Sequence, residues 1–240
     1  MVAHFPWQGE QWRRLTSALA VGQLGHANLF SGRIGAGHDE FAYAFAKFLL
    51  CEQRDTLSAS PTTTGEAPEA CNECRGCLLF DAGNHPDLMI VTPEEEGKVI
   101  GVDQIRALSG FYSLKSHYGG SKLAIISPAD AMNRAASNAI LKTLEEPPNQ
   151  ASLILVTDRF DAISMTVRSR CQRVAFEHID QGEAFKWLSH HTTSPDEATE
   201  LLDASLGAPL KALELKESGG ASVHQELLGA WSQVAKGAVS

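Results

Sequence analysis

Basic residues are scarce in this chain, and their scarcity limits what it can bind. There are 20 lysines and arginines against 29 aspartates and glutamates, which gives a net charge of −9. Affinity for the phosphate backbone of DNA or RNA rests on lysine and arginine. The net charge therefore argues against broad electrostatic binding of nucleic acid by this chain alone.

Long apolar runs are also missing. No stretch approaches the roughly 20 apolar residues that cross a bilayer, and the first residues, MVAHFPWQGEQWRR, lack the charged start and apolar core of a secretory signal. These absences predict an intracellular, cytoplasmic protein without a membrane partner. The composition, with 43% hydrophobic and 20% charged residues over 240 positions, fits a globular chain of one or two domains.

Cysteine is rare, with five residues, but three of them are clustered. In a reducing compartment they are expected to be thiols or metal ligands rather than disulfides. The cluster is a C-x2-C-x2-C motif formed by Cys71, Cys74 and Cys77. A tight turn at this spacing lets the thiolates converge on one zinc ion, which takes four ligands in a tetrahedron. Cys51 is the favoured fourth ligand, and the remaining candidates are His85 and Cys171.

Two other interpretations of the cysteine motif are weaker. A ferredoxin-type iron–sulfur cluster needs another cysteine four residues on, and that position holds Asp81. Three free thiols in a surface turn would be a liability, because exposed thiolates are reactive. No water-activating partner stands beside the motif, so a closed, structural zinc site is expected.

Strand and helix signals alternate along most of the chain. Short apolar runs predict strands, and longer stretches with apolar residues every three or four positions predict helices. The expected strands cover residues 26–32, 87–93, 122–127, 152–158 and 172–176. The expected helices cover residues 39–50 and 101–116, then a long stretch that starts after Pro128 and stops at the Pro147-Pro148 pair, with a short helix or turn over 161–171. Strands separated by helices indicate an α/β fold, a mostly parallel sheet with helices on both faces.

The strand signals stop near Phe176, and this suggests the domain boundaries. Residues 1–177 are expected to form the α/β domain, with a cysteine module inserted at about 51–80. Residues 178–218 are expected to form a small helical domain, and residues 219–240 a polar linker followed by the start of another helix. Residues 52–70 are rich in serine, threonine, proline and alanine, which predicts a low-complexity loop.

The segment SGRIGAGHDE follows the first predicted strand and has the frame of a phosphate-binding loop. The motif G-x4-G-K-[ST] needs two glycines, here Gly32 and Gly37, then a lysine and a hydroxyl residue. His38 and Asp39 stand in the last two positions. Histidine is shorter than lysine and mostly neutral at pH 7, and Asp39 places a carboxylate where phosphate oxygens would lie. By itself, this loop could equally be a glycine-rich turn kept for packing.

The second half of a nucleotide site is missing as well. An active site of this type needs an acidic pair at the end of an apolar strand, to hold Mg²⁺ and to position water. The strand over 122–127 ends in Ser127 and Pro128, and the first acid is Asp130. Because both halves are lost together, we expect a site that binds no ATP.

Three segments carry a family resemblance. SNAILKTLEEPP, LILVTD and VRSRCQRVAF together closely resemble the clamp-loader subunits of bacterial DNA polymerase III, which are members of the AAA+ superfamily. The resemblance runs from Pro6 to about Leu213 and includes that family's four-cysteine zinc module, at Cys51, Cys71, Cys74 and Cys77. The defective loop is similar to the ATPase-deficient member rather than to the gamma/tau ATPase. The loop between the first two cysteines looks long, and only the start of the family's C-terminal collar domain is expected before Ser240.

The resemblance implies a fold, a function and partners. The fold would be an AAA+ type parallel sheet with a zinc-module insertion and a small helical lid. Within Ser169-Arg170-Cys171, Arg170 would be an arginine finger acting in trans on ATP bound to a neighbouring gamma subunit, although a solvated surface arginine also fits the sequence. The partners would be gamma/tau and delta subunits, and the sliding clamp and primer-template DNA would be reached through the complex. The cofactor would be one structural zinc ion, with no ATP.

Other positions carry weaker signals. Thr157 ends a strand where AAA+ proteins carry a polar sensor, and Leu210 stands where the ATPase subunits carry a sensor arginine. The helix end at Lys142, Glu145 and Glu146 is similar to an interface or coupling element, but a solvated helix end explains it as well.

Two alternatives for the function of the chain remain open. One is an ATP-hydrolysing gamma/tau-type subunit, and the other is a zinc-bearing nucleic-acid-binding module, for which Arg75 is the one basic residue within CNECRGC.

Overall fold

The core of the protein is a parallel sheet of five strands. A computed structural model describes residues 4–59, 67–95, 97–118 and 120–218. The strand order is β2-β3-β4-β1-β5, and every pairing is parallel. Strands β1 and β3 are buried along their whole length, which is why they read as continuous apolar runs rather than as alternating patterns. The strands are β1 Ala27–Gly32, β2 Leu88–Val91, β3 Lys122–Ile126, β4 Ala151–Thr157 and β5 Gln172–Phe176.

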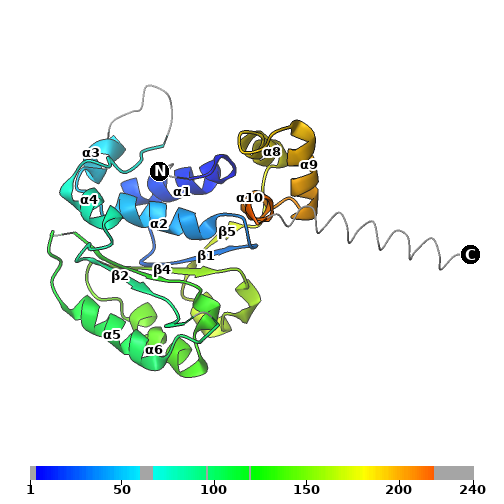
Figure 1. Cartoon of the computed structure of the whole chain (residues 1–240). Coiled ribbons are helices and arrows are strands. Elements are labelled where there is room, and N and C mark those ends of the chain that lie inside the picture. Colours follow the sequence, from blue (N-terminus) through cyan, green and yellow to red (C-terminus); the bar gives the residue numbers. More distant parts are fainter. Residues whose placement is uncertain (1–3, 60–66, 96, 119, 219–240) are drawn as a thin grey trace, which may run out of the picture. The chain divides into compact units, whose positions relative to one another are not determined.

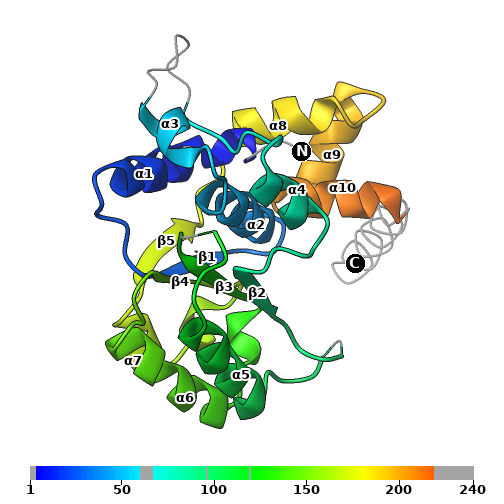
Figure 2. The same ribbon diagram turned by 90° about the vertical axis from the view of Figure 1, so that its left-hand side faces the viewer.

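Helices cover both faces of the sheet, as Figures 1 and 2 show from two directions. One face carries α1 Gly9–Ala20, α2 His38–Leu49, α3 Arg54–Ala59 and α4 Arg75–Asp81. The other face carries α5 Val102–Ser113, α6 Arg134–Glu145 and the short α7 Met165–Arg168. The expected α/β architecture is confirmed. In the described part of the chain, no helix combines the length and the apolar character that crossing a membrane requires.

Helix α6 begins later than the sequence pattern predicts. The expected helix started after Pro128, but Ala129–Ala131 form a single 3-10 turn and α6 begins at Arg134. The side chain of Asn133 accepts a hydrogen bond of 2.8 Å from the backbone N–H of Ala136, which caps the new helix. The early start was therefore wrong, because an internal asparagine cap divides the segment.

The N-terminal helix α1 was not predicted, although its tryptophan anchors one face of the sheet. The Trp12 side chain is fully buried and packs edge-on against Phe41 and Phe45 of α2. Its ring N–H donates a 3.0 Å hydrogen bond to the backbone oxygen of Pro68. The proposed low-complexity loop at 52–70 also contains helix α3 and is thus only partly a loop in the described residues.

The described chain divides into two compact units. The first runs to Gly32 and resumes from Gly37 to Glu177, and the second comprises Arg33–Ala36 and the chain from His178 onward. The second unit holds α8 Gln181–Ser189, α9 Pro195–Ala204 and α10 Pro209–Glu217. Asp180 and Ser194 cap α8 and α9 through their side chains. The linker and collar helix expected at 219–240 lie outside the described residues.

A buried charge pair joins the amino ends of β2 and β3. The Asp87 carboxylate accepts hydrogen bonds from the Ser116 hydroxyl and from the backbone N–H groups of His117 and Tyr118. The Lys122 ammonium lies 3.6 Å from the same carboxylate, and both side chains are buried. Burial opposes ionisation, but these hydrogen bonds and the lysine charge outweigh it and lower the pKa of Asp87.

Replacing Asp87 with alanine should lower the free energy of unfolding by about 3 kcal/mol or more, because the Lys122 charge would remain buried without its partner. Chemical denaturation at pH 7 measures this. A carboxyl group with a lowered pKa stabilises the folded state above its unfolded pKa, and the contribution is lost as the pH falls below about 4. The stability gap between the natural chain and Asp87→Ala should therefore narrow in acid. Asp103→Ala is the control, since Asp103 is 88% exposed in a surface ion pair. Equal losses for both variants would contradict the argument.

Candidate functional site

The two glycines of the phosphate-loop frame are explained by close packing. A Cβ atom on Gly32 would lie 2.8 Å from Nδ1 of His38. Gly37 has φ +81°, and a Cβ atom there would lie 2.6 Å from the ring of Phe5. The backbone oxygen of Gly37 also accepts a 2.8 Å hydrogen bond from Gln8. Only glycine fits this backbone and these contacts, so the frame persists here for reasons that do not involve phosphate.

The two replaced motif positions make internal contacts. His38 is buried at the start of α2, with its Nε2 atom 3.1 Å from Oδ1 of Asp158. The hydroxyl of Ser127, at the carboxyl end of β3, donates a 2.6 Å hydrogen bond to Oδ1 of Asp39. Asp39, which replaces the hydroxyl residue of the motif, is thus hydrogen-bonded to Ser127, which stands where an active site would carry its acidic pair. No local motif marks Asp158 in the sequence, although it lies just after β4, at the carboxyl end of a strand, where parallel sheets bind ligands.

Asp130 does not replace the missing acidic pair. Its carboxylate accepts a 2.7 Å hydrogen bond from the hydroxyl of Thr157. It also forms an ion pair of 2.6 Å with the guanidinium of Arg159. The sensor-like threonine is therefore engaged with an aspartate of its own chain. These contacts form a local polar network at the carboxyl ends of β3 and β4.

The tip of the phosphate loop, Arg33–Ala36, belongs to the second compact unit, the one that holds α8, α9 and α10. The Arg33 guanidinium donates to the backbone oxygens of Leu206 and Gly207, at 2.7 and 2.9 Å. Gly35 has φ +82°, and a Cβ atom on it would lie 2.8 Å from both Cβ and the backbone N of Lys211. Leu210, where the resemblance predicts the loss of a sensor arginine, donates its backbone N–H to the backbone oxygen of Gly35 at 3.3 Å. The loop tip is thus closely packed by its own chain.

Arg170 is exposed and held by its own chain. Its guanidinium forms a 2.8 Å ion pair with Glu145 at the end of α6. It also donates to the backbone oxygen of Thr166 at 3.0 Å and to the hydroxyl of Ser169 at 3.3 Å. The side chain is 35% exposed, so its donors are oriented and still accessible. Burial raises the pKa of its neighbour Cys171 to about 12, which makes that thiol unreactive.

Arg170 lies at the amino ends of the strands, whereas the phosphate loop lies at their carboxyl ends. Arg170 lies two residues before β5, whose first residue Gln172 pairs with Asn28 near the amino end of β1. The loop follows the carboxyl end of the same strand, after Gly32. At about 3.3 Å per residue, β1 separates the two by roughly 17 Å. Arg170 therefore cannot reach a phosphate in its own loop.

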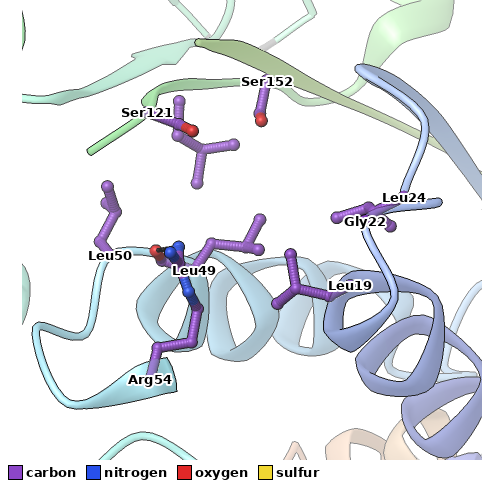
Figure 3. A pocket seen from close by; sticks show the side chains of 9 residues that line it. Leu19, Gly22, Leu24, Leu49, Leu50, Arg54, Ser121 and Ser152 are labelled. Atoms are coloured by element: carbon purple, nitrogen blue, oxygen red, sulfur yellow. Dashed lines mark hydrogen bonds between the residues drawn. The ribbon is translucent and has the colours of Figure 1, made fainter. Parts of the chain in front are cut away.

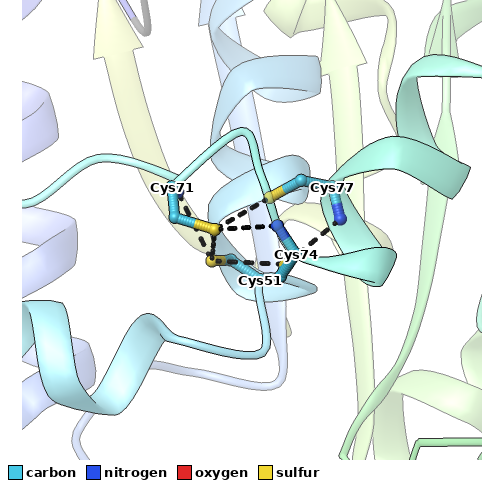
Figure 4. Close-up of side chains that lie close together, drawn as sticks. All are labelled: Cys51, Cys71, Cys74 and Cys77. Atoms are coloured by element: carbon cyan, nitrogen blue, oxygen red, sulfur yellow. Dashed lines mark hydrogen bonds between the residues drawn. The ribbon is translucent and has the colours of Figure 1, made fainter.

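The four cysteines named by the sequence converge on one point, as Figure 4 shows. The sulfur of Cys51 lies 3.6 Å from that of Cys71 and 4.0 Å from that of Cys74, and Cys71 lies 3.9 Å from Cys77. Four thiolates around zinc at 2.3 Å would stand about 3.8 Å apart. The distances therefore fit one tetrahedral metal ion. The structure brings Cys51 to this cluster, rather than His85 or Cys171.

Local backbone geometry supports a thiolate at Cys71. Successive N–H groups donate to sulfur, from Cys74 to Cys71 at 3.3 Å and from Cys77 to Cys74 at 3.4 Å. At Cys71 burial opposes ionisation, but hydrogen bonds from the backbone N–H groups of Glu73 and Cys74 prevail and lower its pKa to about 7. Burial raises the pKa of Cys51 and of Cys77 instead. A cation at the centre would favour the thiolate form of all four.

A separate pocket of 190 Å³ lies on the edge of the sheet away from the loop (Figure 3). Leucines from α1 and α2, including Leu19 and Leu49, form its apolar wall, while Ser121 and Ser152 lie at the amino ends of β3 and β4. Arg54 lines it too, with its guanidinium donating to the backbone oxygen of Leu49 at 2.6 Å. Ligands of parallel sheets bind at the carboxyl ends of the strands, so this pocket is not the nucleotide position.

The fold defines the class of protein. The strand order and the strand–loop–helix unit at β1 are those of an AAA+ type α/β protein. A solved structure of a DNA polymerase III gamma-subunit-related protein from Thermotoga maritima matches 87% of this chain and 60% of that chain, with a TM-score of 0.53 and 23% identity. The expected AAA+ fold is confirmed.

The sequence comparisons then identify the family. Residues 7–180 match the family described as DNA polymerase III, delta subunit, and the chain belongs to this family. It is 36% identical over 219 residues to DNA polymerase III subunit delta' of Pseudomonas aeruginosa, covering 90% of this chain and 62% of that protein. It is 33% identical over 212 residues to the delta' subunit of Escherichia coli K12, covering 88% and 60%. The chain thus spans about three fifths of the length of these relatives, and the resemblance inferred from its motifs is confirmed.

Proposed function

We propose that this chain is a non-hydrolysing, delta'-type subunit of the bacterial DNA polymerase III clamp loader. It would support the loading of the sliding clamp onto primed DNA and supply Arg170 to a neighbouring ATPase subunit. The observation that carries the proposal is the 2.6 Å hydrogen bond between Ser127 and Asp39. In a working site these two positions would hold Mg²⁺, whereas here they bind each other.

The phosphate side of the site supports the same conclusion. The lysine of a working loop reaches the outer phosphates, but His38 is buried against Gly32 and faces Asp158. The carboxylates of Asp39 and Asp158 would repel phosphate oxygens. Neither position offers a donor that replaces the lysine.

The position of Arg170 supports a role in trans. Arg170 lies at the amino ends of the strands, about 17 Å from the phosphate loop of the same chain. A phosphate that Arg170 contacts must therefore belong to another chain. Guanidinium presents a planar fork of donors to phosphate oxygens and stays charged at every physiological pH. Glu145 would hold the fork in place before the neighbour docks. We propose gamma/tau and delta subunits as the partners, with clamp and primer-template DNA contacted through the assembly in the cytoplasm.

The cysteine cluster is proposed to hold one structural zinc ion. Four sulfurs leave no open position for water or substrate, which distinguishes such a site from a catalytic one. The nearby cations do not form a nucleic-acid surface. Arg75 lies over the ring of Tyr118, and Lys47 is bonded to Asn72 and Asp81. The charges around the module therefore serve its own packing.

Calorimetric titration with ATP and Mg²⁺ tests the vacant site. We expect no tight binding by the 240-residue chain, because the lysine and the magnesium ligands are both replaced. A double variant, His38→Lys with Asp39→Thr, restores the motif and serves as the comparison. The double variant should bind ATP no better than the natural chain. Ser127 still stands where an active site carries its acidic pair, and Gly35 is still packed against Lys211. Tight, Mg²⁺-dependent binding by the natural chain would favour the gamma/tau-type alternative instead.

A further inference from the structure

Three potential metal ligands meet at the start of α2, apart from the four cysteines. One ring nitrogen of His38 and one carboxylate oxygen each from Asp39 and Asp158 all lie within 4.8 Å of one another. The Nε2 atom of His38 is 3.1 Å from Oδ1 of Asp158 and 3.9 Å from Oδ2 of Asp39. The proposed function gives this cluster no ligand.

The histidine is the strongest sign that something binds here. Its side chain is only 2% exposed, and neither ring nitrogen has a hydrogen-bond partner among the described residues. Burying a polar group without such a partner is costly. The ring is fixed between Gly32 and Phe176, so it cannot turn outward to find water. Its Nε2 atom lies beside the two carboxylates, yet it forms no hydrogen bond with either.

The charges point to a cation. Asp39 and Asp158 face the histidine, and no lysine or arginine of the described residues lies within 4.0 Å of either carboxylate. The amino end of α2 offsets part of this negative charge. A divalent ion would neutralise both carboxylates and give the buried imidazole a bond at the same time.

We propose that His38, Asp39 and Asp158 bind one divalent metal ion of the Mn²⁺ type. One imidazole and two carboxylates form a mixed nitrogen and oxygen set, which suits Mn²⁺ better than the softer metals, zinc among them, that thiolates select. Asp39 and Asp158 are 47% and 37% exposed, so they can rotate to close the last distances. Ser127, bonded to the other oxygen of Asp39, orients that ligand. The ion would fasten the start of α2 to the end of β4 where a related ATPase holds its nucleotide.

Mn²⁺ is the probe, because the four-cysteine cluster prefers softer ions. Electron paramagnetic resonance of free Mn²⁺ counts the ions bound by the purified 240-residue chain, without nucleotide. We expect one ion per chain and a modulation from an imidazole nitrogen in the spin-echo spectrum. Asp158→Asn should weaken binding about tenfold or more, and Asp39→Asn should do the same. His38→Gln should remove the nitrogen signal.

Asp161→Asn is the matched control, since Asp161 is an exposed aspartate three residues from Asp158 whose partner is Arg168. It should bind Mn²⁺ like the natural chain. The proposal is overturned if no ion binds below about 1 mM, if binding survives Asp158→Asn, or if the bound ion shows no nitrogen coupling. Nitrogen coupling in the natural chain keeps the test valid even if His38→Gln folds poorly. The Mn²⁺ measurements contain no nucleotide and leave Arg170 unchanged, so their failure would not overturn the proposed function, which the ATP titration and Arg170→Ala test.

Discussion

Replacing Arg170 with alanine should lower ATP hydrolysis at the neighbouring subunit's site about a thousandfold in a reconstituted clamp loader. The guanidinium is proposed to stabilise charge that develops as the phosphoryl group is transferred, so ATP binding by the neighbour should change little. The complex should still assemble, because one exposed side chain seldom decides a large interface. Total activity should fall less than activity at that site, since other sites use other fingers. Single-turnover hydrolysis in the assembled complex measures the effect.

Two further variants separate a finger from a general loss of charge. Arg170→Lys should not restore activity fully, because a point charge lacks the bidentate fork. Glu145→Gln should cause a smaller loss, since glutamine can still accept a hydrogen bond from Arg170 but no longer forms the 2.8 Å ion pair.

The choice of control follows from the structure. Arg168 and Arg173 both lie over the ring of Phe160, and Arg173 is also bonded to Ser31 and Glu177. Replacing either one would disturb packing as well as charge. Arg106 is 72% exposed in a surface pair on α5, so Arg106→Ala is the matched control. If it lowers hydrolysis as much as Arg170→Ala does, the finger assignment is wrong and the effect is diffuse electrostatics.

Replacing Cys74 with serine should release the zinc ion from the chain and loosen the module at about 51–80. Structural zinc in small modules contributes on the order of 10 kcal/mol to folding the segment around it. The module's remaining ties to the sheet domain include the Lys47–Asp81 ion pair and the Trp12–Pro68 hydrogen bond. Hydrogen exchange should therefore speed up in α4 while β1, β3 and β4 stay protected. Elemental analysis should find one zinc per natural chain and none in the variant.

Cys171→Ser provides the matched substitution, because Cys171 lies outside the cluster. It should keep one zinc per chain, even if the loss of a mostly buried thiol lowers stability. Iron in place of zinc, or equal zinc content in Cys74→Ser and the natural chain, would contradict the assignment. Loss of protection throughout the sheet would show instead that the module is part of the main folding unit.

The sequence by itself determined the sheet, the cysteine set and the family. Short apolar runs such as LAII and LILV indicate buried strands, and their alternation with amphipathic helices indicates a parallel sheet. The cysteine spacing is a local property, so three of the clustered cysteines could be named directly, and the structure places Cys51, the first of the three further candidates, beside them. The replaced motif residues were equally visible, because a phosphate loop is a short, contiguous pattern.

Tertiary structure decided how the distant polar groups pair. The Ser127–Asp39 bond joins residues 88 positions apart, and the Asp158–His38 contact joins β4 to α2. Neither can be deduced from spacing, since strand order alone brings the carboxyl ends of β1, β3 and β4 together. The side on which Arg170 lies depends in the same way on β5 running parallel to β1. Local sequence patterns indicate which helices and strands form, whereas the register of a parallel sheet decides which side chains meet at the ends of its strands.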